Sequence, residues 1–316
     1  MGVDKPGSRA WTNVLKAVFL RRGGVIPKGS GVSLGGEIHD GLLGRRVRIG
    51  SRAYLRRMRE LAAEAAPLDI AGGTITTPAG FKVATLTESG AVTVTGSGWL
   101  FYELVPAGGG GGSVRAGGGG GGRPKTGKVW VTPGVYAVTI GEAGLGAAAG
   151  NSPTVAANGG NTTAFGVTAI GGGAGGAAYR GGTLQPPDGK PGGNGGGAGP
   201  WGTGDGMGGA STDGGYQGGA GKDSAVANER AGGGGAGAGG PGGTATISTR
   251  GLGGPGVAST CPGVSATYCK GGDGASMSTV GVVGANPGDG GGAGGNGNTA
   301  GANGARGIVH CWVATA

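Results

Sequence analysis

The N-terminal part of the chain carries apolar residues at helical spacing. WTNVLKAVFLRR (residues 11–22) gathers its large apolar side chains on one face, and SRAYLRRMRELAAEAAP (residues 51–67) follows the same spacing. Ser51 is a suitable N-cap for the second segment and Pro67 a suitable stop. Both segments predict helices, and the glycine-punctuated stretch between them predicts turns and short strands.

From residue 71 the pattern changes to alternating apolar and polar residues, which is typical of half-buried strands. GAVTVTG (90–96), WLFYELV (99–105) and RGIVHCWVATA (306–316) each predict one strand. KVWVTPGVYAVTIGEAG predicts two more strands around a turn at Pro133-Gly134. These strands place four aromatic residues in the expected core: Tyr102, Trp130, Tyr136 and Trp312.

Glycine replaces both patterns in the rest of the chain. Of 316 residues, 90 are glycine, with 17 before residue 107 and 73 from there on. The glycine-rich segments alternate with ordinary loops and have no fixed period; they are 108–112, 117–122, 171–176, 192–199, 214–221, 232–243, 251–256, 271–274 and 288–297. The chain has no strict G-X-Y repeat, which excludes collagen.

Short glycine segments can form a structure of their own. A polyproline-II helix has three residues per turn and no internal hydrogen bonds, and one built from glycine can approach its neighbours closely enough to bond with them. Many such segments would form a slab with loops at its two ends. The alternative is a series of flexible linkers, but these are usually rich in serine, which is scarce in the glycine runs here.

Composition separates the chain into parts. Residues 1–69 carry 13 Lys and Arg against 6 Asp and Glu, whereas residues 70–316 carry 12 against 10. We therefore expect a basic, partly helical N-terminal attachment region at 1–69 and a β-rich segment at 70–106. The glycine-rich slab follows at 107–316, so the expected fold is mostly β and irregular.

The sequence offers little catalytic chemistry. The two histidines, His39 and His310, take part in no Ser-His-Asp or Cys-His pattern. GxGxxG patterns arise by chance in so much glycine and lack a strand–turn–helix context. No apolar run reaches the length of a membrane span, and the N-terminus lacks a signal-peptide pattern. We expect no enzyme activity, no cofactor and no metal site.

Aromatic and basic residues in the loops are candidates for contact with a receptor, because tyrosine and tryptophan are enriched at binding hot spots. These candidates are Tyr179, Arg180, Trp201, Tyr216, Tyr268 and Lys270. Cys261 and Cys269 flank one loop, which a disulfide between them would pin; two free thiols are the alternative. With that bridge formed, Cys311 would be unpaired and buried.

Several stretches resemble one protein family in the expected order. VWVTPGVYAVTIGEAG, NGGNTTAFG and AIGGGAGG resemble glycine-rich tail-fibre and tail-tip proteins of tailed bacteriophages. ESGAVTVTGSGWLFYELVPAGGGGG and GANGARGIVHCWV resemble the first and last strands of the same domain, so the resemblance covers roughly residues 75–316. It implies a polyglycine-II sandwich, receptor contact through loops at its tip, and a separate N-terminal region that attaches to the phage.

The resemblance implies a structural protein of the virion, located at the tail tip or fibre and made in the host cytoplasm. It would bind other phage tail proteins through residues 1–69 and a bacterial surface protein or polysaccharide through its loops, with a homotrimer or a trimeric fibre as a further partner and no nucleic acid. The attachment candidates are Trp11, Phe19, Arg52, Arg56 and Arg57, although a solvated basic face is the simpler explanation of the arginines. The alternatives are a purely structural tail-assembly or capping protein and an ice-binding or surface protein.

Overall fold

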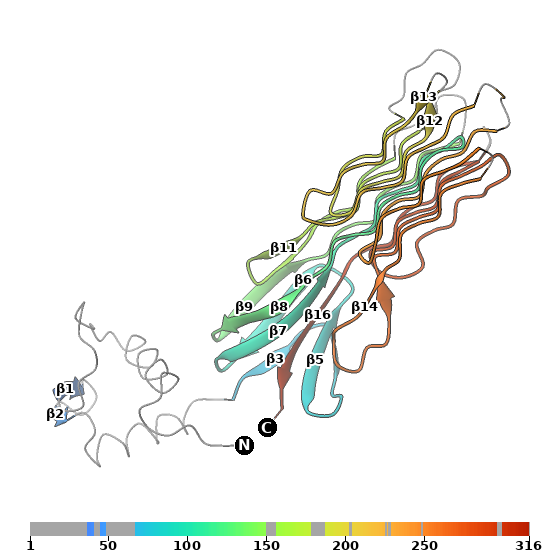
Figure 1. Ribbon diagram of the computed structural model, residues 1–316. Coiled ribbons are helices and arrows are strands. Elements are labelled where there is room, and N and C mark those ends of the chain that lie inside the picture. Colours follow the sequence, from blue (N-terminus) through green and yellow to red (C-terminus); the bar gives the residue numbers. More distant parts are fainter. Residues whose placement is uncertain are drawn as a thin grey trace. The chain divides into compact units, whose positions relative to one another are not determined.

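Figure 1 shows a computed structural model of the chain. The described residues are 37–40, 45–48, 67–149, 156–177, 187–201, 204–224, 226, 229–247, 249–295 and 299–315. The chain divides into two units, Met1–Ala66 and Pro67–Ala316. In the first unit, β1 (Glu37–Asp40) and β2 (Arg45–Arg48) form an antiparallel pair. Both predicted helical segments lie outside the described residues, except for Pro67, and the described part of the chain contains no helix.

Two five-stranded antiparallel sheets form one end of the second unit (Figure 1). The first sheet has the order β11-β10-β9-β6-β3, with β3 (Asp69–Ala71), β6 (Gly90–Thr95), β9 (Gly134–Thr139), β10 (Thr162–Ala164) and β11 (Val167–Ala169). The second has the order β4-β5-β16-β7-β8, with β4 (Thr74–Thr76), β5 (Phe81–Leu86), β7 (Gly98–Val105), β8 (Lys125–Val131) and β16 (Ile308–Ala314). The C-terminal strand β16 therefore lies in the middle of its sheet, between β5 and β7.

Alternating apolar residues hold the two sheets together. Val92 and Val94 of β6 are buried against Leu100 and Leu104 of β7 and Val309 of β16, all in one core cluster. The predicted strands at β6, β7 and β16 are confirmed. The two strands around Pro133-Gly134 are also present, but β8 pairs with β7 whereas β9 pairs with β6. The turn therefore connects the two sheets and does not close a hairpin.

Extended segments, which we call rods, continue from this β-sandwich. In the rod at 107–112, successive N–H groups donate to three different neighbours and the pattern repeats every third residue. Residues 107 and 110 donate to the rod at 157–160, residues 108 and 111 to 302–305, and residues 109 and 112 to 117–120. This is the period expected of three residues per turn. The glycine segments are hydrogen bonded to their neighbours and do not act as free linkers.

The rod at 117–122 lies at the centre of the slab. It donates hydrogen bonds to three rods and accepts hydrogen bonds from three others. A Cβ at Gly119 or Gly120 would overlap a backbone oxygen of a neighbouring rod. Glycine is therefore required at the centre by close approach of backbones.

Rods at the outside of the slab need fewer glycines, so the search for glycine-rich segments in the sequence does not find them. In the rod at 141–147, Gly141, Gly144 and Ala147 are buried while Glu142 and Leu145 are exposed. Only one residue in three faces its inner neighbours, so the other positions accept larger side chains. Further rods of mixed composition run at 206–210, 281–285 and 300–305, and the segment 232–243 is two rods joined by a turn at Gly237–Gly240.

The rods run back and forth, so their turns gather at two ends, as the sequence predicts. One end adjoins the β-sandwich and includes the turns at 211–214, 237–240 and 286–289, together with the hairpin of β14 (Val257–Ala258) and β15 (Thr267–Tyr268). The distal end includes 113–116, 222–231 and 246–249, together with the hairpin of β12 (Pro200–Trp201) and β13 (Gly204–Asp205) (Figure 1).

Candidate functional site at the distal end

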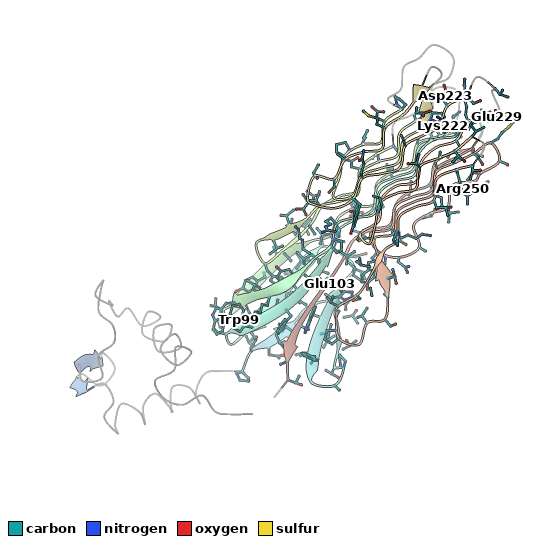
Figure 2. All side chains as sticks on the ribbon, in the orientation of Figure 1. Trp99, Glu103, Lys222, Asp223, Glu229 and Arg250 are labelled. Carbon is teal, nitrogen blue, oxygen red and sulfur yellow. The ribbon has the colours of Figure 1, made fainter. Side chains whose placement is uncertain are left out.

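Charged side chains connect the loops of the distal end (Figure 2). Lys222 Nζ lies 2.8 Å from Asp205 Oδ2, and the Asp223 amide donates to Asp205 Oδ1 over 2.9 Å. Arg230 Nε in turn lies 2.7 Å from Asp223 Oδ1. The hydrogen bond from Lys222, aided by the Asp223 amide, lowers the pKa of Asp205 below its ordinary value. These contacts connect the β12–β13 hairpin to the loop at 222–231.

A strained turn lies buried at the centre of this end. Val114 and Arg115 have φ values of 65° and 57°, in the left-handed region that β-branched and bulky residues rarely occupy. Ser113 is fully buried, and the Arg115 amide donates to the Gly294 carbonyl over 2.8 Å. The turn joins the two central rods as predicted, and the surrounding rods hold its unfavourable backbone in place.

Among the described residues, the predicted contact residues lie in different parts of the slab. Tyr179 and Arg180 lie outside the described residues, and the backbone of Trp201 lies in β12 at the distal end. Tyr216 is 40% exposed, but its amide donates to Asn194 near the sandwich end of the slab. Lys270 is exposed and lies two residues after the end of β15.

The prediction for Tyr268 as a loop residue in contact with a receptor is wrong. Its side chain is only 4% exposed, and its hydroxyl lies 3.0 Å from His310 Nε2. The hairpin of β14 and β15 folds back onto the outer face of the sheet that contains β16, so its apolar residues pack there. Burial and the nearby Glu103 raise the pKa of Tyr268 to about 12.

Sequence reasoning missed Glu103, which anchors this hairpin. Glu103 is 2% exposed, accepts a 2.6 Å hydrogen bond from Ser259 Oγ, and accepts a 3.0 Å bond from the Thr260 amide. It lies directly opposite His310 on the neighbouring strand. The sequence contained a signal for this role, because a carboxylate that is buried in the otherwise apolar strand WLFYELV needs hydrogen-bond partners. This network fastens the hairpin to the sandwich, which accounts for the burial of Glu103.

Burial also disfavours charge on His310. Its Nδ1 lies 2.9 Å from Thr85 Oγ1 and the ring is 2% exposed. Burial lowers the pKa of His310 below its ordinary value, while Glu103 acts in the opposite direction.

The three cysteines are free and buried, so the bridge between Cys261 and Cys269 is not formed. Cys261 packs with Val83 and Trp312, whereas Cys269 belongs to a separate cluster around Tyr268. Cys311 is fully buried in the core of the sandwich, although the bridge on which that expectation depended is not formed. Burial raises the pKa of both Cys261 and Cys311 to about 12 and that of Cys269 well above its ordinary value.

Trp130 is not a core residue, contrary to prediction. It is 51% exposed and pairs edge to face with Trp99, which is 50% exposed, at a centroid distance of 5.6 Å. Lys128 Nζ lies 4.9 Å from the centre of the Trp99 ring. The reason is topological, because β8 is an edge strand whose outer face the hairpin does not cover. Trp312 is buried as predicted, stacked on Phe101 at 5.9 Å, while Tyr102 and Tyr136 pack partly buried against the core.

The remaining predicted residues lie outside the described part of the chain: Trp11, Phe19, Arg52, Arg56 and Arg57. Among the residues that the structure describes, no group of three His, Cys, Asp or Glu is placed to hold a metal ion. No helix in that same part is long and apolar enough to cross a membrane.

A family model of a glycine-rich domain matches residues 86–313. The chain belongs to this family of glycine-rich domains. The match begins at the last residue of β5 and ends within β16, so the glycine-rich domain includes the whole slab and most of the sandwich. A comparison with curated proteins finds no match.

Proposed function

We propose that this glycine-rich domain is part of a bacteriophage tail tip or tail fibre and binds the host surface through its distal loops. The proposal rests on one observation, which is that the two ends of the second unit differ. The chain enters it at β3 and leaves it after β16, both in the sandwich, whereas the loops between rods gather at the opposite end (Figure 1). An adhesin needs this arrangement, with attachment at one end and contact at the other.

The slab suits this function because its stability does not depend on the loops. We infer that it is a polyglycine-II array, held by backbone hydrogen bonds that repeat every third residue. Loop sequences can then change without disturbing the hydrogen bonds of the rods. Binding and recognition residues are often found on loops that a rigid scaffold positions.

The distal end has the chemistry of a polar recognition surface. Lys222 pairs with Asp205, Arg230 pairs with Asp223, and Glu229 accepts a hydrogen bond from Ser224, so charges of both signs lie in these loops. Each loop contact is expected to be weak, and several copies on one particle would give strong attachment through avidity. The N-terminal region, residues 1–69, would attach the domain to other tail proteins.

The test exchanges loops at opposite ends of the slab. Residues 200–206 and 222–231 are replaced by Gly-Ser segments of equal length in phage particles, and adsorption to the host is measured. We expect the adsorption rate to fall at least about tenfold, because weaker loop contacts let more particles leave the surface before they attach firmly. The matched control replaces the turn at 211–214 next to the sandwich and leaves adsorption unchanged.

Two outcomes would contradict the proposal. Normal adsorption with both distal loops replaced would remove the receptor role and favour a structural tail protein. Absence of the chain from purified particles would remove the assignment to the virion. Thermal unfolding of the isolated variants checks that the exchanged loops leave the slab folded.

A further inference from the structure

The second sheet of the sandwich has one long open edge. Its last strand, β8, pairs with β7 through seven successive residues, without a bulge or a proline. The other three edges of the two five-stranded sheets are β3, β4 and β11, which have three residues each. Short edge strands, bulges and prolines are devices by which proteins prevent a further strand from pairing. β8 has none of these three devices.

The backbone of β8 is open on its outer side. In an edge strand, every second residue directs its N–H and C=O groups away from the neighbouring strand. Apart from the ladder with β7, no backbone group of residues 125–131 forms a hydrogen bond with another described residue. Four residues of the strand are exposed, namely Thr126, Gly127, Lys128 and Trp130. The outer side of β8 can therefore form a further ladder.

Aromatic side chains border this open edge. Trp99 and Trp130 lie directly opposite each other on β7 and β8, and each is half exposed. Phe101 lies opposite Lys128 two residues further along, so these four side chains share one face of the sheet. Leu100 points to the other face, into the core. A strand added to β8 would lie beside Trp130 and cover part of its exposed ring, and burial of an aromatic ring favours binding.

The charge of β8 selects the kind of strand that fits. Residues 125–131 include two lysines and no acidic residue. Lys125 is paired with Asp213 over 2.8 Å, whereas Lys128 lies 4.9 Å from the centre of the Trp99 ring and forms no ion pair with a described residue. Two copies of β8 in one ladder would bring four lysines together with no carboxylate from either strand, which is unfavourable. A strand with an acidic residue opposite Lys128 is favoured instead.

We propose that β8 binds an extended segment of another protein, which adds a strand to the sheet. The segment carries an acidic residue opposite Lys128 and an apolar residue two positions away, beside Trp130. In this mode of binding, backbone hydrogen bonds supply affinity and the alternate side chains supply specificity. Trp99 marks the sandwich end of the second unit, away from Lys222 and Asp223 at the distal end (Figure 2). The site is therefore separate from the distal loops and goes beyond the proposed function.

The experiment adds the peptide Ser-Glu-Val-Ile-Val-Glu-Ser to the purified full chain and follows backbone amide hydrogen exchange by NMR. Without peptide, every second amide of β8 should exchange rapidly, because it faces solvent. With peptide, these amides should become protected, which reports hydrogen bonds to an added strand. The matched peptide Ser-Lys-Val-Ile-Val-Lys-Ser should bind at least about fivefold more weakly, because its lysines repel Lys128.

Substitutions on the two strands locate the contact. Lys128→Glu should reverse the preference between the two peptides. Lys270→Glu is the matched control at another exposed lysine, on the slab, and should leave the preference unchanged. Trp130→Thr should weaken binding more than Trp99→Thr, because Trp99 lies one strand further from the added segment. Thermal unfolding checks that each variant keeps its fold.

Several results would overturn the proposal. Protection of all β8 amides in the free chain at every concentration would mean that another segment of this chain covers the edge. Protection that rises with protein concentration would identify a second copy as the partner. Equal binding of the two peptides would remove the role of Lys128, and unprotected β8 amides at a millimolar concentration of the acidic peptide would remove the strand site itself.

Discussion

Substituting a single glycine in the central rod tests whether backbone contact holds the slab together. Gly119 donates its N–H to the Gly291 carbonyl and accepts the N–H of Gly272, both over 2.8 Å. In Gly119→Ala, the new Cβ would overlap the carbonyl oxygen of Gly109 on the next rod. Because the overlapping atom belongs to backbone, no side chain can rotate away, and the two rods must separate.

The size of the effect follows from the bonds between these rods. Two hydrogen bonds join them, from Gly109 to Gly120 over 2.9 Å and from Gly112 to Gly117 over 3.0 Å. Each contributes roughly 0.5–1.5 kcal/mol net, and overpacking a close-packed interior costs roughly 1–3 kcal/mol more. We expect Gly119→Ala to lower the free energy of unfolding by about 2–6 kcal/mol.

Urea denaturation monitored by tryptophan fluorescence measures this change. The control is Gly90→Ala in β6, where an added Cβ would meet no atom within 4 Å, and its stability should be unchanged or slightly raised. In a flexible linker, Gly→Ala would leave stability nearly unchanged, because the backbone is free in both the folded and the unfolded state. Equal midpoints for Gly119→Ala and Gly90→Ala would refute a packed rod.

Two further predictions concern buried titratable groups. Burial lowers the pKa of His310 in the folded protein, so on acidification the unfolded chain takes up this proton at a higher pH than the folded protein does. The free energy of unfolding should therefore fall as the pH drops below about 6.5, the ordinary pKa of histidine. His310→Gln should flatten that part of the curve of unfolding free energy against pH, and an unchanged curve would contradict the assignment. Cys261, Cys269 and Cys311 are free and buried, so a thiol reagent at pH 8 should react with none in the native domain and with all three in denaturant without reductant. Fewer reactive thiols in denaturant would reveal a disulfide.

Local patterns predicted the strands well but not their partners. The alternation in GAVTVTG and WLFYELV is visible because each strand has one face in the core. The sequence did not show which sheets the two strands around Pro133 would join, because the same turn residues occur in a hairpin and in a connection between sheets. The hairpin at 257–268 was likewise predicted as an exposed loop, because nothing local shows that Tyr268 meets His310, 42 residues later.

The candidate contact residues show the same limit. An aromatic residue in a loop does not show at which end of the slab that loop lies. Tyr216 proved to lie near the sandwich, and Trp130, expected in the core, is half exposed on an edge strand.

The sequence by itself determined which kinds of segment this protein is made of, namely glycine-rich rods and half-buried strands. Runs of glycine permit backbones to approach until their amides and carbonyls form hydrogen bonds with one another. The strands before and after the glycine-rich region have alternating apolar residues, and these supply the apolar core to which the slab is joined. The tertiary structure decided which rods lie at the centre, where glycine is obligatory, and which lie outside, where one residue in three can face solvent. The physical reason is that hydrogen bonds between rods depend on neighbours in space, and a glycine run carries no side-chain pattern from which those neighbours can be read.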